Sequence, residues 1–368
     1  MKNSLNKCTI FISRNFWNYY LHPCQKAYAI ELAKCSKYEI TWIDPPTRNP
    51  LTWLKSWKFK DPTGVTVYRP FATNREYESF SILDKILFWA QLVFIIPIKK
   101  KPNLWSIACP HPWLAKSNFF SFKIYWPGDF FDPKNEYYLY ENYDLVMSWT
   151  NKGVKQIPHR FKGYSFKTST CPGDAFTFHQ KNVEKRANFA SQEVTYSKPY
   201  IIYVGGLSSR RVDFEILEFL AKELPLFSLI LVAKPDGRPE TSSKIAKLLK
   251  HGNVRLLDNL KYEELPSIVN SAHVGIVPYL VNYDNSGICP NKIFEYASLA
   301  VPIVSTAIPA VFDYSPPVMI AKNKDMFLSM TKEYLTEPKS EELTRKLKIM
   351  AKESTPSSNI ERIQNLIS

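Results

Sequence analysis

The sequence predicts an α/β protein built from two Rossmann-like, doubly wound domains that face a cleft. First, short apolar, β-branched runs alternate with helix-like stretches, which is typical of parallel sheets covered by helices. Second, a polar stretch at residues 179–198 interrupts this alternation, and we interpret it as a linker. Third, a length of 368 residues is enough for two domains of ordinary size.

We predict the first domain over residues 1–180. Its clearest helix is the amphipathic stretch CQKAYAIELAKCS, Cys24–Ser36. Its strands are predicted from apolar runs at Cys8–Ser13, Tyr38–Asp44, Leu104–Cys109, Phe122–Pro127 and Tyr143–Thr150.

The second domain is predicted over residues 199–355, where the alternation is more regular. Its strands are expected at Tyr200–Gly206, Phe227–Ala233, Asn253–Asp258, His273–Tyr279 and Ala300–Thr306. Its helices are expected at Asp213–Leu224, Ser243–Gly252, Tyr262–Ala272 and in a short segment that begins at Pro290. A closing helix at residues 356–368 is expected to pack back on the first domain.

The positive charge is concentrated in the first half of the chain. Residues 1–180 contain 24 Lys and Arg against 13 Asp and Glu, a net charge of +11 out of +14 for the whole protein. Two basic stretches there are also rich in apolar and aromatic residues, LTWLKSWKFK (Leu51–Lys60) and FSILDKILFWAQLVFIIPIKKK (Phe80–Lys101). We expect them to contact an anionic membrane surface. A buried core helix with a solvated basic end is the alternative for the second stretch.

The compartment is expected to be the cytoplasm, with the protein peripheral on the inner face of the cell membrane. The six cysteines show no C-x-x-C or zinc spacing, and the first residues contain too short an apolar run for a signal peptide. The second basic stretch is interrupted by Asp84, Lys85 and Gln91, whereas a bilayer span needs roughly 20 apolar residues. We therefore do not expect it to cross the membrane.

The stretch SGICPNKIFEYASLAVPIVST, residues 286–306, carries the most chemical information. It follows a predicted strand, and ligands of open parallel sheets bind beyond the carboxyl ends of strands. Pro290 suits a first helical turn, and free N–H groups around 287–291 could receive a phosphate or diphosphate. Lys292 is a cation in that first turn, where a bound anion would relieve its conflict with the helix dipole. Glu295 lies one turn further, where its carboxylate could accept two vicinal hydroxyls.

This stretch resembles the donor-site signature of GT-B glycosyltransferases, commonly P-x-K-x-x-E-Y-x-A-x-G-x-P-V-V-S. Upstream, YVGGLSSRRVDFEIL is similar to the glycine turn that follows the first strand of the C-terminal domain in these enzymes. LKYEELPSIVNSAHVGIVPY is similar to the helix and strand that precede their donor loop. The resemblance covers about Tyr200–Ser305 and is only architectural before that.

The resemblance implies a donor site for a nucleotide-sugar. Glu295 would hold the ribose, and Lys292 and Arg211 would neutralise the diphosphate, with Arg210 as the alternative to Arg211. The diphosphate itself would lie on the amides near Cys289, Pro290 and Asn291, and the glycine turn of Gly205 and Gly206 would also belong to the donor site. Backbone contacts near Lys234 and Leu257 would select the base, for which we expect uridine rather than guanosine. The nucleotide-sugar is a substrate, and neither a cofactor nor a metal is expected.

Two departures from the signature bear on the reaction. Many retaining members carry a second glutamate where this chain has Gly287, and the usual glycine before PIVS is replaced by Ala300 and Val301. The sequence is thus more similar to bacterial polysaccharide enzymes with the shorter P-x-K-x-x-E-Y form, as in glycosyltransferase family 4 and the glucuronosyltransferase of xanthan assembly. Retention or inversion of configuration stays open.

The acceptor side of the cleft is expected in the first domain. An attacking hydroxyl must lose a proton, and IYWPGDFFDP places Asp129 after a predicted strand as a candidate base. This element also resembles the Y-D-x-x-D element of related sugar transferases. A turn or helix-capping aspartate is the alternative. His22 and His111 are candidates for acceptor contacts or for packing, and CPGDAF (Cys171–Phe176) is similar to the hinge into the second domain.

These observations favour a glycosyltransferase that extends a lipid-linked oligosaccharide for a capsule, lipopolysaccharide or exopolysaccharide. A nucleotide-sugar 2-epimerase of the same fold is one alternative. A non-catalytic basic nucleic-acid-binding protein is another, although no recognition motif supports it and we expect no nucleic-acid partner. The sequence has no D-x-D, HExxH, GxSxG, P-loop or GxGxxG motif, so it does not support a metal-dependent GT-A, hydrolase, kinase or dehydrogenase interpretation.

Overall fold

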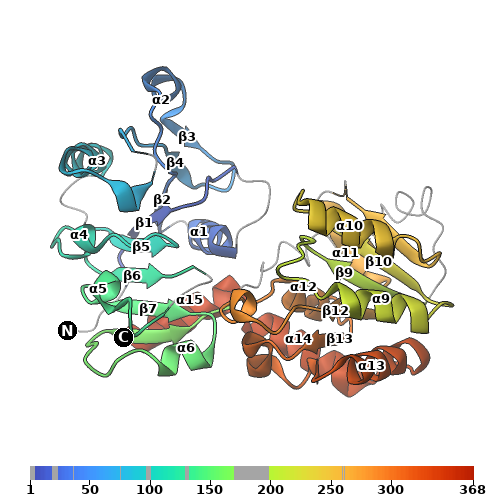
Figure 1. Ribbon diagram of the computed structural model, residues 1–368. Helices are drawn as coiled ribbons and strands as arrows, with labels where there is room; N and C mark the ends of the chain where they lie inside the picture. Colours follow the sequence, from blue (N-terminus) through green and yellow to red (C-terminus); the bar gives the residue numbers. More distant parts are fainter. Residues whose placement is uncertain are drawn as a thin grey trace. The chain divides into compact units, whose positions relative to one another are not determined.

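The computed structural model describes residues 5–18, 24–35, 37–74, 76–96, 101–128, 132–169, 199–258, 260 and 262–368. The chain forms two compact units (Figure 1). The N-terminal unit comprises Met1–Thr168 together with Pro356–Ser368, and the C-terminal unit comprises Ser169–Thr355. The expected linker at 179–198 and the expected hinge at 171–176 lie outside the described residues.

The N-terminal unit is built on one eight-stranded sheet with the order β3-β4-β2-β1-β5-β6-β7-β8. All its neighbouring strands are parallel except β3 and β4, which pair antiparallel at one edge. The strands are β1 (Cys8–Ser13), β2 (Glu39–Ile43), β3 (Lys58–Lys60), β4 (Thr66–Tyr68), β5 (Asn103–Ile107), β6 (Lys123–Trp126), β7 (Leu145–Ser148) and β8 (Tyr164–Lys167).

Helices accompany this sheet. They are α1 (Cys24–Lys34), α2 (Pro50–Ser56), α3 (Ile82–Ile95), α4 (Pro112–Ala115), α5 (Tyr137–Tyr140), α6 (Asn151–Lys155) and α15 (Pro356–Ile367), with the 3₁₀ turn η1 (Tyr77–Ser79). The chain end returns to this unit because α15 packs on α1 and β8. Asn359 Nδ2 donates a 2.7 Å hydrogen bond to the hydroxyl of Tyr28, and Gln364 Nε2 donates one of 3.0 Å to the hydroxyl of Tyr38.

The helix α3 has one face in the core and one in solvent. A capping box begins it, because Ser81 Oγ accepts from Asp84 N while the Asp84 side chain accepts from Ser81 N. Phe88 and Leu92 are buried in the core. Within the described part of the chain, no helix combines the length and the apolar character that crossing a bilayer requires.

The C-terminal unit contains a six-stranded parallel sheet with the order β11-β10-β9-β12-β13-β14. Its strand order reverses between β9 and β12, which makes this the topological switch point of the sheet. The strands are β9 (Tyr200–Val204), β10 (Ser228–Val232), β11 (Val254–Leu257), β12 (Val274–Val277), β13 (Ile303–Thr306) and β14 (Met319–Ala321).

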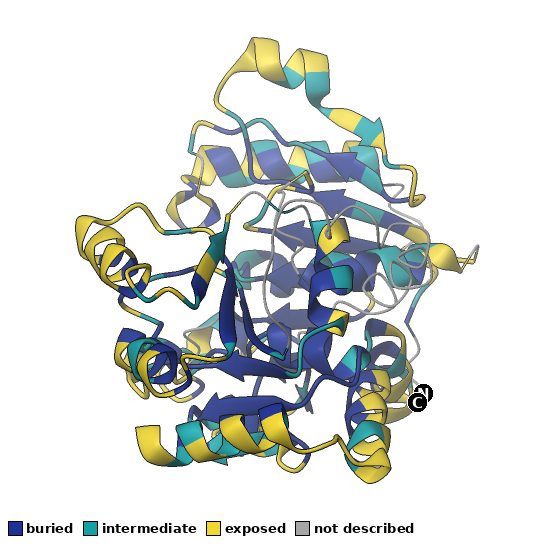
Figure 2. Ribbon diagram, turned by 90° about the vertical axis from the view of Figure 1, so that its right-hand side faces the viewer, coloured by how far each residue is buried: buried dark blue, intermediate teal, exposed yellow. Residues whose placement is uncertain are grey.

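The helices of this unit connect the strands and cover the sheet. They are α9 (Phe214–Glu223), α10 (Pro239–Leu248), α11 (Leu265–Asn270), α12 (Lys292–Ser298), α13 (Lys324–Thr336) and α14 (Glu341–Glu353), with the 3₁₀ turns η3 (Tyr262–Glu264), η4 (Tyr283–Asn285) and η5 (Pro309–Tyr314). The strands are mainly buried and the helices expose their outer faces (Figure 2). Asp213 caps α9 by accepting hydrogen bonds from Glu215 N and Ile216 N.

The short helix α12 ends in a tight reversal. Ala300 N donates to the Ala297 carbonyl and Val301 N donates to the Tyr296 carbonyl, both at 2.9 Å, which is the pattern of a Schellman motif. Ala300 has φ of +54°, a left-handed conformation that favours glycine. The signature glycine is therefore replaced by alanine at a position that still adopts the glycine conformation.

The structure confirms the predicted fold class and most of its predicted strands. The sequence did not predict β3 and β4, which are only three residues each, nor β8, β14, α13 and α14. The expected helix at Tyr262–Ala272 is divided into η3 and α11, since Pro266 lies inside it and suits only a first turn.

Candidate functional site

The candidate site lies at the switch point of the C-terminal sheet. Gly205 directly follows β9, Tyr279 lies just beyond β12, and Lys292 is the first residue of α12. Because the carboxyl ends of parallel strands meet at one edge, these residues come together although they are far apart in the sequence. The structure thus joins two segments that the sequence singled out separately.

The ammonium group of Lys292 is enclosed by aromatic rings. Its Nζ donates a 2.8 Å hydrogen bond to the Tyr279 hydroxyl, and it lies 4.1 Å from the ring centroid of Tyr203 and 4.4 Å from that of Tyr279. The residue is only 5% exposed. Cation–π contacts of this kind hold a cation in a fixed position when it is desolvated.

Gly205 is required for this arrangement. Its φ is +136°, and a Cβ atom at this position would lie 2.9 Å from the Lys292 Nζ. A side chain would therefore meet both backbone strain and a collision with the lysine. The adjacent turn is fixed by a 2.7 Å hydrogen bond from the Tyr203 hydroxyl to the Gly206 carbonyl.

Glu295 lies one turn further along α12 and is 6% exposed. Burial raises the pKa of Glu295 to about 7, while the positive charge of Lys292 and a hydrogen bond from Tyr262 oppose the rise. The Tyr262 hydroxyl donates to Glu295 Oε1 at 3.4 Å. A buried carboxylate with a single long hydrogen bond retains acceptor capacity for ligand hydroxyls.

The two candidate arginines lie in different surroundings. Burial raises the pKa of Tyr203 well above its usual value, and the charge of Arg211 opposes this rise, so Arg211 is close to the ring that encloses Lys292. Arg210 is exposed and its charge acts on Glu240 instead. The geometry therefore favours Arg211 as the cation that supplements Lys292.

The remaining predicted donor residues lie in loops and strand ends of the same unit. Cys289 and Pro290 are buried and Asn291 directly precedes α12. Lys234 has an exposed side chain, and its carbonyl accepts from Leu207 N at 3.0 Å. The carbonyl of Leu257, at the end of β11, accepts from Ala233 N at 3.0 Å. Both carbonyls thus already hold loops at the carboxyl edge of the sheet.

The predicted acceptor residues are less well placed. His111 is 0% exposed and its ring packs edge-on against Tyr77 at 4.8 Å between centroids. Burial lowers the pKa of His111 to about 3, so the ring is neutral. It packs in the core and does not reach a surface in this conformation. His22 and Asp129 lie outside the described residues.

Sequence reasoning missed the three tyrosines of the site, Tyr203, Tyr262 and Tyr279. Each stands in a stretch that resembles the family, but none belongs to the quoted donor signature. The available signal was position, since Tyr203 precedes the glycine turn by two residues and Tyr279 ends a predicted strand. In the described ranges, His, Cys, Asp and Glu side chains form no group of three that could hold a metal ion.

Comparisons with known proteins match the C-terminal unit to a family and part of the chain to a named relative. The family Glycosyl transferases group 1 matches residues 198–347. TuaH of Bacillus subtilis (strain 168), whose name describes a teichuronic acid biosynthesis glycosyltransferase, is 24% identical over 115 residues, 31% of this chain. The match spans 28% of the length of that relative.

Solved structures extend the similarity to the whole chain. The Candida albicans trehalose-6-phosphate phosphatase N-terminal domain superposes with a TM-score of 0.72 at 11% identity, covering 100% of this chain and 97% of that one. An E. coli trehalose-6-phosphate structure bound with UDP-2-fluoro glucose has a TM-score of 0.71 at 10% identity, covering 98% of both chains. An α,α-trehalose-phosphate synthase (UDP-forming) from Burkholderia vietnamiensis has a TM-score of 0.66 at 9% identity, covering 98% and 99%.

These matches confirm the expected GT-B fold and the expected family of the C-terminal unit. Sequence identities of 9–11% to the solved structures show only a shared fold. The range matched by the family contains the positions of all predicted donor residues. Residues 198–347 match the family Glycosyl transferases group 1, and the chain has the fold of GT-B glycosyltransferases.

Proposed function

We propose that the protein transfers a sugar from a nucleoside-diphosphate donor to a lipid-linked oligosaccharide or polysaccharide acceptor in cell-surface polysaccharide biosynthesis. The observation that carries the donor part is the buried pair of Lys292 and Glu295 at the switch point of the C-terminal sheet. Burying a lysine and a glutamate without a direct ion pair is costly, so a ligand that satisfies both groups gives the arrangement a purpose. A diphosphate suits the lysine and ribose hydroxyls suit the carboxylate.

Uridine is the base that we propose for the donor. A solved relative in fold is bound with UDP-2-fluoro glucose, and others are named UDP-forming synthases. The proposed acceptor class is supported by the name of TuaH, which refers to teichuronic acid biosynthesis. We propose Asp129 as the base that accepts the acceptor proton, and a transfer step that needs no metal or other cofactor.

We further propose that the protein works on the cytoplasmic face of the cell membrane, as a peripheral protein. Exposed apolar side chains on α2 and α3 support this proposal, namely Leu51, Leu54, Ile82, Leu83, Ile86 and Phe94, each between 62% and 81% exposed. The end of α2 lies near the end of α3, since the ring centroids of Trp57, which directly follows α2, and Phe94 are 6.5 Å apart. We call these six residues the apolar patch.

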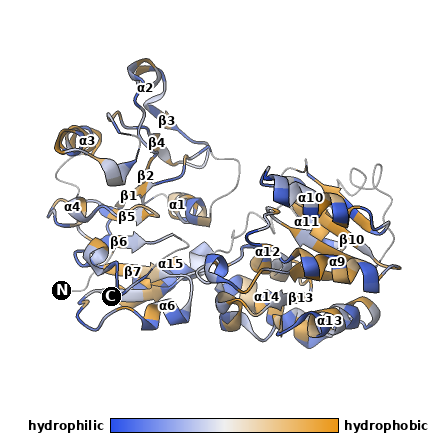
Figure 3. Ribbon diagram, in the orientation of Figure 1, coloured by the Kyte–Doolittle hydropathy of each residue, from blue (hydrophilic) through white to orange (hydrophobic). Residues whose placement is uncertain are grey.

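Positively charged lysine side chains are also exposed in this part of the N-terminal unit. Lys55, Lys58 and Lys60 are exposed on α2 and β3. Apolar side chains with lysines beside them suit the headgroup layer of an anionic membrane. Figure 3 shows α3 as a hydrophobic helix at the margin of the N-terminal unit. A membrane bound at this surface would bring a lipid-linked acceptor within reach of the same unit.

Sugar transfer tests the proposed function. Purified protein would be incubated with membranes and radiolabelled UDP-sugars, and label in the lipid-linked fraction would be counted. We expect incorporation with one UDP-sugar by the wild type and by Glu333→Ala, whose carboxylate is exposed on α13, but not by Glu295→Ala. Label released only as free sugar would contradict transfer and favour an epimerase or hydrolase.

A further inference from the structure

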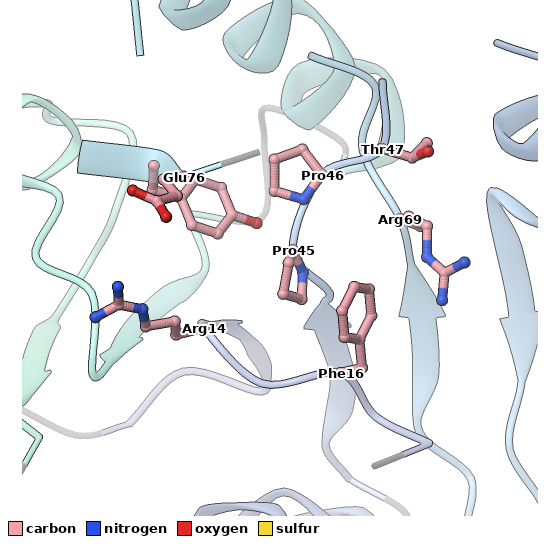
Figure 4. Close-up of a pocket in the computed structure, with 8 residues that line it drawn as sticks. Arg14, Phe16, Pro45, Pro46, Thr47, Arg69 and Glu76 are labelled. Carbon is pink, nitrogen blue, oxygen red and sulfur yellow. The ribbon is translucent and has the colours of Figure 1, made fainter. Parts of the chain in front are cut away.

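The N-terminal unit contains a cavity of about 370 Å³ at the carboxyl edge of its sheet (Figure 4). Its charged lining residues are Arg14, Arg69 and Glu76. Arg14 directly follows β1, and Arg69 directly follows β4. The backbone N–H of Arg14 donates to the carbonyl of Ile107 in β5. The strand order reverses between β1 and β5, so Arg14 marks the position where open parallel sheets bind ligands.

The charged side chains that line this cavity form no ion pair with one another. In the described ranges, the side chains of Arg14 and Glu76 take part in neither an ion pair nor a hydrogen bond. Arg69 is 25% exposed and reaches the Asp44 carboxylate with a single contact of 3.4 Å. A guanidinium has five N–H donors, so most of the donor capacity of both arginines is available to an anionic ligand.

The remaining walls are apolar and rigid. Tyr77 is 4% exposed, and its hydroxyl donates a 2.7 Å hydrogen bond to the Asp44 carbonyl, which fixes the ring. Pro45 and Pro46 follow Asp44 at the end of β2, and the proline rings restrict their φ angles. Phe16 is 41% exposed, with the Arg69 guanidinium 5.0 Å from its ring centroid. A preformed cavity with apolar walls and a few polar groups at its margin is typical of a small-molecule site.

We propose that this cavity binds a sugar unit that carries an anionic group, either a carboxylate or a phosphate. Arg14 receives the anion, because a guanidinium recognises both groups with paired hydrogen bonds. The Glu76 carboxylate accepts hydroxyls of the ring, and Phe16 and Tyr77 cover its apolar faces. The inference rests on the proposed function in one respect, since it assigns this sugar unit to the acceptor and so makes the acceptor glycan acidic.

Direct binding to the full chain tests this inference. The probes are methyl glucuronoside, glucose 6-phosphate, neutral methyl glucoside and inorganic phosphate, titrated by calorimetry at low salt. We expect at least one of the two anionic sugars to bind about tenfold more tightly than the neutral sugar and than inorganic phosphate, because both the anion and the ring are recognised. Preference for the glucuronoside identifies the anion as a carboxylate, and preference for the sugar phosphate identifies it as a phosphate.

Matched variants locate the site. Arg14→Gln is expected to weaken binding of the anionic sugar about tenfold, and Glu76→Gln to weaken both anionic and neutral sugars. Arg48→Gln removes the same charge from an exposed neighbour outside the lining and is expected to leave binding unchanged. Arg14 and Glu76 are exposed, so these variants should keep the wild-type unfolding temperature.

Each outcome has a distinct meaning. Equal binding of neutral and anionic sugars, equal weakening by Arg14→Gln and Arg48→Gln, or no binding of any probe would overturn the inference. A parallel titration with UDP separates it from the proposed function. Binding of UDP without the anionic sugar contradicts only the cavity assignment, whereas binding of the anionic sugar without UDP contradicts only the proposed donor site.

Discussion

At the scale of single residues, Glu295 stands out because its burial opposes folding. The free carboxyl has a pKa of 4.5 and the folded one about 7, so the folded state holds a proton that the unfolded chain releases. The contribution of Glu295 therefore lowers the free energy of unfolding as pH rises from 4.5 to about 7, and this free energy stays lower at higher pH. A ligand that binds the Glu295 carboxylate explains why the chain retains this residue despite its cost in stability.

The first prediction concerns Glu295→Gln, which removes the buried charge. At pH 8 we expect the free energy of unfolding to rise by about 2 kcal/mol, and at pH 4 to remain within about 0.5 kcal/mol of the wild type. Urea denaturation at the two pH values measures both quantities. Equal stability of the two proteins at pH 8, or a less stable variant, would show that the carboxylate is compensated inside the fold.

The second prediction concerns Tyr279→Phe, which keeps the ring over Lys292 but removes its hydrogen bond. The ammonium group should become less well positioned, so UDP should bind roughly threefold to tenfold more weakly while uridine binds unchanged. Calorimetric titration of both ligands measures the difference. Tyr138→Phe, an exposed tyrosine of the other unit, serves as control. Equal losses for UDP and uridine would assign Tyr279 to the nucleoside instead of the diphosphate.

The third prediction concerns Ala300→Gly at the end of α12. Because Ala300 has φ of +54°, glycine should remove steric strain and raise the free energy of unfolding by about 1 kcal/mol. Chemical denaturation of the variant measures this. A destabilised variant would mean that the flexibility of glycine in the unfolded chain outweighs the strain.

Residue types predicted the site only where they are unusual for their position. A lysine in a first helical turn followed by a glutamate one turn later is such a case, and both are found in the buried cluster. Tyrosines at strand ends are ordinary core residues, and their contact with Lys292 depends on the pairing of β9 with β12. His111 could equally pack or bind, and the aromatic core around Tyr77 buries it.

At the scale of elements, α2 and α3 differ most from ordinary surface helices. A membrane-binding role requires that the apolar patch, and not only net charge, contributes. The triple variant Ile82→Gln, Ile86→Gln and Phe94→Ser should lose most sedimentation with anionic liposomes at low salt, because each buried large side chain contributes about 1.5–3 kcal/mol. Leu226→Gln, at a residue of the C-terminal unit that is 84% exposed, should sediment as the wild type does. Unchanged sedimentation of the triple variant would exclude the patch.

The sequence predicted long alternating elements well and short edge elements poorly. Strands such as β1 and β10 are buried over their whole length, so they appear as continuous apolar runs. The antiparallel β3 and its partner β4 are three residues each. No residue of β3 is fully buried, whereas β4 buries two of its three residues. Such strands exist because a neighbour pairs with them, and their own composition does not reveal this.

At the scale of the whole molecule, most of the positive charge and the predicted donor residues lie in different parts of the chain. Residues 1–180 hold +11 of the net +14, whereas the donor residues lie in the C-terminal unit with its 3-2-1-4-5-6 strand order. Membrane binding by this charge should weaken from 50 to 500 mM salt, because screening shortens the range of exposed charges. Liposome sedimentation across salt concentrations checks this, and salt-independent binding to neutral liposomes would contradict an electrostatic contribution.

The central claim is that the buried Lys292 and Glu295 receive a nucleoside diphosphate. Calorimetric titration of the purified protein with UDP, GDP, CDP and ADP tests it most directly, with Glu295→Ala and the exposed control Glu333→Ala beside the wild type. We predict tight binding of one diphosphate, UDP, that Glu333→Ala retains and Glu295→Ala loses. If none of the four binds, or if Glu295→Ala binds as the wild type does, the cluster at the switch point is only a packed turn and the claim is wrong.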